Sequence, residues 1–125
     1  MKLAWSWGPV VLWMAATFAA SHRSAIAIPF GAPDYVAHAL GYAGLGALLV
    51  RALGGGPLGS MTRSLIVPAA LIGALYCLSD EFHQSFIPGR MASVGDLAAD
   101  AIGSLGGAAA AAAMGAFVRR MRGRV

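Results

Sequence analysis

The sequence predicts an all-α membrane protein, namely a four-helix transmembrane bundle with both termini in the cytoplasm. The chain has 125 residues, of which 58% are hydrophobic and 11% charged. A soluble domain is about half apolar and about a quarter charged, so the surplus apolar surface of this chain must face lipid. The length fits one domain spanning residues 1–125.

Four segments have the length and apolar character of membrane-spanning helices, which need about 17 to 25 residues. Glycine- and proline-rich stretches separate them. Pro68 lies near the start of the third segment, where it either opens the helix or kinks it. The four predicted spans are 3–20, 35–53, 64–84 and 95–118.

The first span also has features of a secretory signal peptide, because one lysine precedes it and small residues follow at 25–27. Its apolar run is long for a signal peptide, and its three tryptophans suit a retained helix with interfacial anchors. We therefore expect the span to be retained.

The placement of lysine and arginine predicts the orientation. Seven of the nine basic residues fall on the side of both termini, and Arg23 and Arg90 fall on the other. Since cytoplasmic loops carry the excess of basic residues, this bias places both termini in the cytoplasm. The basic tail RRMRGR (119–124) then reads as a topology signal, so no nucleic-acid partner is expected. The seven are Lys2, Arg51, Arg63, Arg119, Arg120, Arg122 and Arg124.

All carboxylates and histidines are predicted at the opposite, outer side. On the second span, Asp34, His38 and Tyr42 form one stripe at i, i+4 and i+8. On the fourth, Asp96 and Asp100 precede Gly103 and Gly107, a pair that permits close helix contact. On the third, one face carries Tyr76, Asp80, His83 and Gln84, while Glu81 points about 100° away.

Some of these acids have a simple structural explanation, but two do not. Asp34 and Asp96 stand where helix N-caps are expected, and an acid is stabilising there. Asp80 and Glu81 instead stand at the C-terminal end of a helix, where the macrodipole disfavours negative charge. Arg90 and the histidines are the candidates to offset it, so we interpret the cluster as functional.

We expect these groups to surround one cavity open to the outer side, with Asp80 and Asp100 as its acidic wall and Arg90 as its lid. No cofactor is expected. Carboxylates and histidines can bind a divalent cation, but the mixed spacings identify no metal. The candidate catalytic residues are Asp80, Glu81, His38 and Asp100. The candidate substrate-binding residues are Arg90, Asp34, Tyr42, His83, Gln84 and Asp96.

Three blocks of the chain resemble the VanZ-like family of small bacterial membrane proteins: DYVAHALGYAGLGALL (34–49), SDEFHQSFIPGR (79–90) and GDLAADAIGSLGG (95–107). The resemblance covers residues 34–107, and the S-D-E-x-x-Q segment with P-G-R is its most specific part. One departure is Asp100, where the family more often has Asn. The resemblance implies a multi-pass protein of the bacterial cytoplasmic membrane, with a link to teicoplanin-type glycopeptide resistance. It implies no particular reaction.

Three functions fit these observations. The first is an enzyme that acts on a lipid-linked or envelope substrate at the outer face, with the acids and His38 in proton transfer and Arg90 holding an anionic group. The second is a non-catalytic interaction module that binds a headgroup or supports another membrane protein. The third is a small proton-coupled carrier, although no polar residue continues the path through the inner half. Membrane lipids are expected partners in each case, and the sequence leaves the oligomeric state open.

Overall fold

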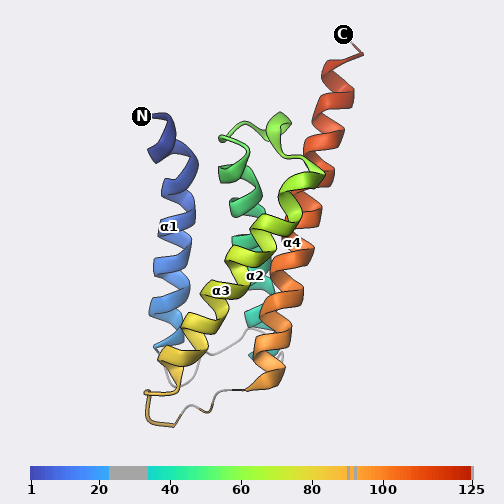
Figure 1. Ribbon diagram of the computed structural model, residues 1–125. Coiled ribbons are helices and arrows are strands. Elements are labelled where there is room, and N and C mark those ends of the chain that lie inside the picture. Colours follow the sequence, from blue (N-terminus) through green and yellow to red (C-terminus); the bar gives the residue numbers. More distant parts are fainter. Residues whose placement is uncertain (23–33, 90, 92, 125) are drawn as a thin grey trace.

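The protein is a bundle of four long helices (Figure 1). The computed structural model describes residues 1–22, 34–89, 91 and 93–124. Each of the four helices is long and apolar enough to cross a membrane, and the described residues contain no strand. The predicted helical membrane architecture is therefore confirmed. The helices are α1 (Lys2–Ser21), α2 (Asp34–Leu53), α3 (Ile66–Gln84) and α4 (Val94–Arg122), with short 3-10 turns η2 (Leu58–Ser60) and η3 (Arg63–Leu65) between α2 and α3.

The helix boundaries settle the role of Pro68 and correct one predicted cap. Pro68 is the third residue of α3, where backbone N–H groups have no partner within the helix, so its missing N–H costs nothing. It opens the helix and does not kink it. The N-cap of α4 is Ser93, whose hydroxyl accepts a hydrogen bond from the Asp96 N–H at 3.4 Å. The expectation that Asp96 is the cap was wrong, because the helix begins two residues earlier.

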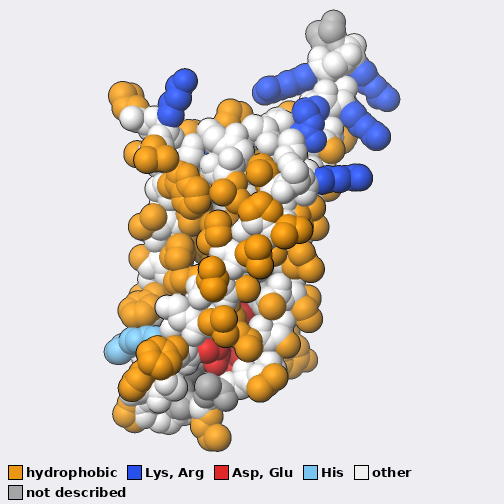
Figure 2. Space-filling model, in the orientation of Figure 1, with side chains coloured by type: hydrophobic (Ala, Val, Ile, Leu, Met, Phe, Trp, Pro, Cys, Tyr) orange, Lys and Arg blue, Asp and Glu red, His pale blue; other side chains and the backbone are white. Residues whose placement is uncertain are grey.

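The two ends of the bundle differ in charge. Both termini lie at one end, and the described Lys and Arg side chains gather there (Figures 1 and 2). We call this the basic end, and we call the opposite end, where α1 and α3 finish and α2 and α4 begin, the polar end. A broad hydrophobic surface lies between them (Figure 2). Helix α4 has 29 residues, about 43 Å at 1.5 Å per residue, so it exceeds a hydrocarbon core of about 30 Å.

Large apolar side chains of α3 point outward and small or polar ones point inward. Val67, Leu71, Leu75 and Phe82 are all more than half exposed. Such a distribution would be unfavourable in water. It suits lipid, because lipid tails are as apolar as these side chains and the side chains need not be buried. The buried face consists of Ala69, Gly73, Cys77, Asp80, Glu81 and Gln84.

Helices α2 and α4 form the most extensive contact of the bundle. Glycine makes it possible, because a Cβ added at Gly103 would collide with the carbonyl oxygen of Ala39, and one at Gly107 with that of Ala43. Small residues let two backbones approach closely in membranes, where packing drives helix association. The Gly103 and Gly107 pair is thus used within the chain.

Two arginines at the basic end hold the connections in place. Arg119 donates from Nη1 to the carbonyl oxygens of Gly59 (2.8 Å) and Met61 (2.9 Å), tying the segment between α2 and α3 to α4. Arg51 donates to the Trp5 carbonyl oxygen at 3.3 Å and lies 5.6 Å from the centre of the Trp5 ring. These arginines therefore have a structural role besides their place in the charge bias.

Candidate functional site

Three carboxylates are buried together at the polar end. The exposed fraction is 2% for Asp80, 8% for Glu81 and 0% for Asp100. Burying an ionised carboxylate is costly unless hydrogen bonds or an opposite charge compensate it. Their surroundings therefore decide what the site can do, and they divide into two neighbouring groups.

The first group surrounds Asp80. Its Oδ2 accepts hydrogen bonds from the Ser21 hydroxyl at 2.7 Å and from Gln84 Nε2 at 3.1 Å, and a longer one from the Tyr42 hydroxyl at 3.5 Å. These donors come from α1, α3 and α2, so the carboxylate joins three helices. Its other oxygen, Oδ1, is buried and has no hydrogen-bond partner among the described residues. Oδ2 of Asp80 is thus held in place, while Oδ1 can accept a further hydrogen bond.

A small cavity adjoins Asp80 between α1, α2 and α3. Its volume is about 70 Å³, and its lining includes Asp80, His38, Tyr42 and Ser21, with Thr17 and small residues completing the wall. On this measure about 10–15 Å³ is enough to hold one water molecule, so the cavity has room for a few waters. Water there would meet the carboxylate and the imidazole together.

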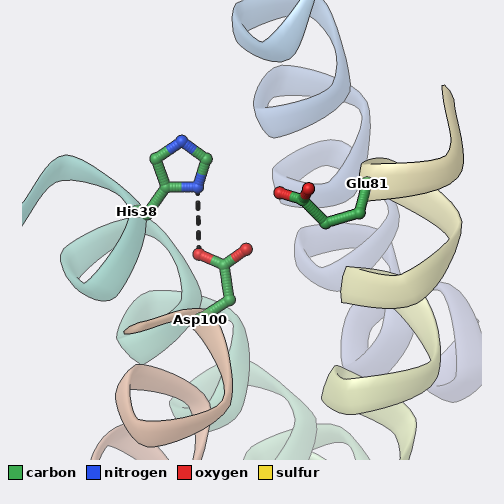
Figure 3. A group of neighbouring side chains, drawn as sticks. All are labelled: His38, Glu81 and Asp100. Carbon is green, nitrogen blue, oxygen red and sulfur yellow. Dashed lines mark hydrogen bonds and ion pairs between the residues drawn. The ribbon is translucent and has the colours of Figure 1, made fainter. Parts of the chain in front are cut away.

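The second group contains His38, Glu81 and Asp100, one residue from each of α2, α3 and α4 (Figure 3). Nδ1 of His38 lies 3.1 Å from Oδ1 of Asp100, and the other Asp100 oxygen accepts a hydrogen bond from the Cys77 thiol at 3.2 Å. Oε2 of Glu81 accepts from the Ser93 backbone N–H at 3.3 Å. Oε1 of Glu81 is buried without a hydrogen-bond partner in the described part of the chain.

His38 connects the two groups, because it lines the Asp80 cavity and also contacts Asp100. The expectation that Asp80 and Asp100 form one acidic wall stays a prediction. Each aspartate has its own donors, and Glu81 is the carboxylate that lies with Asp100. The face of α3 buried by α1, α2 and α4 is wide enough to include Asp80 and Glu81, although the two are about 100° apart on the helix.

The remaining predicted residues lie at the edge of the two groups or outside the described part. His83 points toward α1, with Nε2 3.4 Å from Nδ1 of His22 and its ring 4.3 Å from that of Phe18. Asp96 lines a surface hollow beside the start of α4, and its charge is close enough to act on Glu81. Arg90, the expected lid, and the side chain of Asp34 lie outside the described residues.

Three polar partners were not among the predicted site residues. Ser21 lies at the end of α1, and no local pattern sets it apart from other serines. Ser93 lies just before α4 and did carry a signal, because Ser-x-x-Asp at 93–96 is a helix-capping pattern. Cys77 did carry a signal, because it precedes Glu81 by four residues and so lies on the same helical face.

A class follows from the fold and the site together: this is a multi-pass membrane protein with an acidic and histidine-containing site buried at one end of its helices. Residues 7–115 match the VanZ/LLP1 family, and the chain belongs to that family. The match confirms the resemblance seen in the sequence. No curated protein and no solved structure matches the chain.

Proposed function

We propose that the protein is an enzyme that acts on the headgroup of a lipid-linked cell-envelope precursor, at the outer face of the bacterial cytoplasmic membrane. The observation that carries the proposal is the buried Asp80 beside a small cavity of about 70 Å³ that it shares with His38. A carboxylate and an imidazole next to confined water can take and return protons, which is general acid–base catalysis. Hydrolysis or transfer at the headgroup is the reaction class that suits them.

The location at the polar end supports a headgroup as the reacting part. The cavity is too small to enclose a lipid, so only a small polar portion of a substrate can meet Asp80. The acyl chains would remain along the hydrophobic outer surface of the bundle, which includes Leu75 and Phe82 of α3. The outer face follows from the charge bias, because the basic end would face the cytoplasm.

Asp80 and His38 have distinct roles in this proposal. Oδ2 of Asp80 is held by its three donors, which leaves Oδ1 to accept a proton from water or from the substrate. His38 is oriented by Asp100, much as a carboxylate orients an imidazole in hydrolases. Arg90 would hold an anionic group of the substrate, as expected from the sequence.

A non-catalytic headgroup-binding module is the alternative. It is favoured by the three donors on a single oxygen of Asp80, since such a saturated arrangement also serves to hold α1, α2 and α3 together. A proton-coupled carrier has less support, because the buried core of the basic half is mainly apolar and contains no buried titratable side chain among the described residues. That core includes Leu45, Leu49, Val50, Ala108 and Ala111.

The test compares envelope lipids and cell-wall precursors by mass spectrometry in cells with the wild-type protein, with Asp80→Asn and without the protein. An enzyme changes the abundance of a defined precursor, and Asp80→Asn matches the cells that lack the protein. Purified protein should then convert that precursor. If the precursor binds the purified protein but is never converted, the non-catalytic module replaces the enzyme.

A further inference from the structure

The structure places three metal-ligating side chains together where α2, α3 and α4 meet. One nitrogen of His38 and one carboxylate oxygen each of Glu81 and Asp100 lie within 4.8 Å of one another. The three side chains point toward a common space (Figure 3). We propose that these residues bind one divalent cation, Zn²⁺ or Mn²⁺.

The spacing allows one ion to reach all three ligands. For three atoms no more than 4.8 Å apart, a central point lies within 4.8 Å divided by √3, or about 2.8 Å, of each. Zinc bonds to imidazole and carboxylate measure about 2.0–2.2 Å. Each side chain therefore has to move inward by less than about 1 Å, which side-chain rotation can supply.

Each carboxylate is already oriented for such a ligand set. Ser93 N–H holds one oxygen of Glu81, and the Cys77 thiol holds one oxygen of Asp100. The other oxygen of Asp100 faces His38, while that of Glu81 is buried without a hydrogen-bond partner among the described residues. Hydrogen bonds to the far side of a ligand are the usual means by which proteins orient metal ligands.

One oxygen of Glu81 has no hydrogen-bond partner among the described residues, which separates this cluster from an ordinary group of surface acids. Glu81 is more than nine-tenths buried, so water does not replace the missing partner freely. A cation bound by Glu81 and Asp100 would satisfy that oxygen and balance both negative charges. It would lie between the imidazole of His38 and the carboxylate of Asp100, in place of their direct contact of 3.1 Å.

The donor set indicates the kind of ion. One imidazole and two carboxylates suit Zn²⁺ or Mn²⁺, whereas Ca²⁺ takes six to eight oxygen ligands and Mg²⁺ prefers oxygen ligands with several waters. Three protein ligands leave at least one coordination position for water or substrate, which is the arrangement of catalytic zinc sites. The inference rests on the proposed function only for the use of the ion. With the ion bound, His38 and Asp100 act as ligands, and Asp80 remains the group that takes up a proton.

The experiment measures metal binding without any substrate. The full chain, purified in detergent with a histidine-free affinity tag and stripped with a chelator, is titrated with Zn²⁺ or Mn²⁺, and the bound metal is counted by elemental mass spectrometry. We expect one ion per chain. Pulsed electron paramagnetic resonance of bound Mn²⁺ should detect coupling to an imidazole nitrogen. Less than one ion per chain, or no nitrogen coupling, would overturn the proposal without any variant.

Variants then locate the ion. Glu81→Gln and His38→Ala should weaken binding by at least about 100-fold, and Cys77→Ala by about 10-fold, since it removes only an orienting contact. His22→Ala is the matched control, because this histidine lies at the same end of the bundle and contacts His83. It should bind like wild type. A loss in His22→Ala with normal binding in His38→Ala would place the ion elsewhere and reject the site.

The result is distinguishable from failure of the proposed function. If the protein binds one ion through Glu81 and His38 but converts no precursor, the metal site is supported and the enzymatic function is rejected. If the protein binds no metal and turnover persists after treatment with a chelator, the enzymatic function is supported and the metal site is rejected.

Discussion

Nδ1 of His38 lies 3.1 Å from Oδ1 of Asp100, although 62 residues separate them in the sequence. The contact depends on the close approach of α2 and α4. Gly103 lies almost one turn after Asp100 and packs directly against the backbone of Ala39, the neighbour of His38. The glycines of α4 therefore determine where the imidazole and the carboxylate meet.

Gly107→Val should destabilise the bundle, because the new side chain would collide with the carbonyl oxygen of Ala43. Overpacking of this kind costs about 1–3 kcal/mol. Thermal unfolding in detergent measures the loss. Gly106→Val is the matched control, since a Cβ there has no neighbour within 4 Å, and equal melting temperatures for the two variants would contradict the packing argument.

Arg119→Gln should loosen the connection between α2 and α3, because it removes the charged donor to Gly59 and Met61. Since Arg119 is exposed, we expect a loss of about 1 kcal/mol in stability. Faster proteolysis of the segment around Gly59 would report it. Arg120→Gln removes the same charge from an exposed neighbour and should have no such effect; identical cleavage in both variants would assign the effect to charge alone.

Both termini should lie in the cytoplasm, because seven of the nine basic residues belong to the basic end or its loops. A reporter that is active only outside the cytoplasmic membrane should be silent when fused after residue 125. The same reporter inserted after residue 87, between α3 and α4, should be active. Activity in the reverse pattern would place the site on the cytoplasmic side and end the proposal of an outer-face substrate.

Asp80→Asn should abolish the proposed activity while the protein still inserts and accumulates. The change keeps the size of the side chain but removes the charge, and loss of a general acid or base typically lowers a rate by about 100- to 10,000-fold. The level of the precursor found by mass spectrometry measures it, with Ser85→Ala, an exposed change at the same helix end, as control. Full activity at normal abundance would show that Asp80 only joins the helices.

Sequence alone determined the membrane architecture and the end of the bundle that carries the site. Length and hydropathy define spanning helices, because a lipid core of fixed thickness imposes both. The positions of the carboxylates and histidines near the ends of the four spans also predicted that they all lie at the outer side of the membrane. These are properties of single segments, so they can be predicted without knowing how the segments pack.

Only the tertiary structure decided which polar groups meet. The helical wheel assigned Asp80 and His83 to one face and Glu81 to another, yet the bundle buries both acids and leaves His83 beside His22. Rotation of each helix about its axis depends on contacts such as Gly103 with Ala39, which involve residues far apart in the chain. The pairing of Glu81 with His38 and Asp100 follows from those contacts, because close backbone packing fixes side-chain distances that no spacing within one helix can specify.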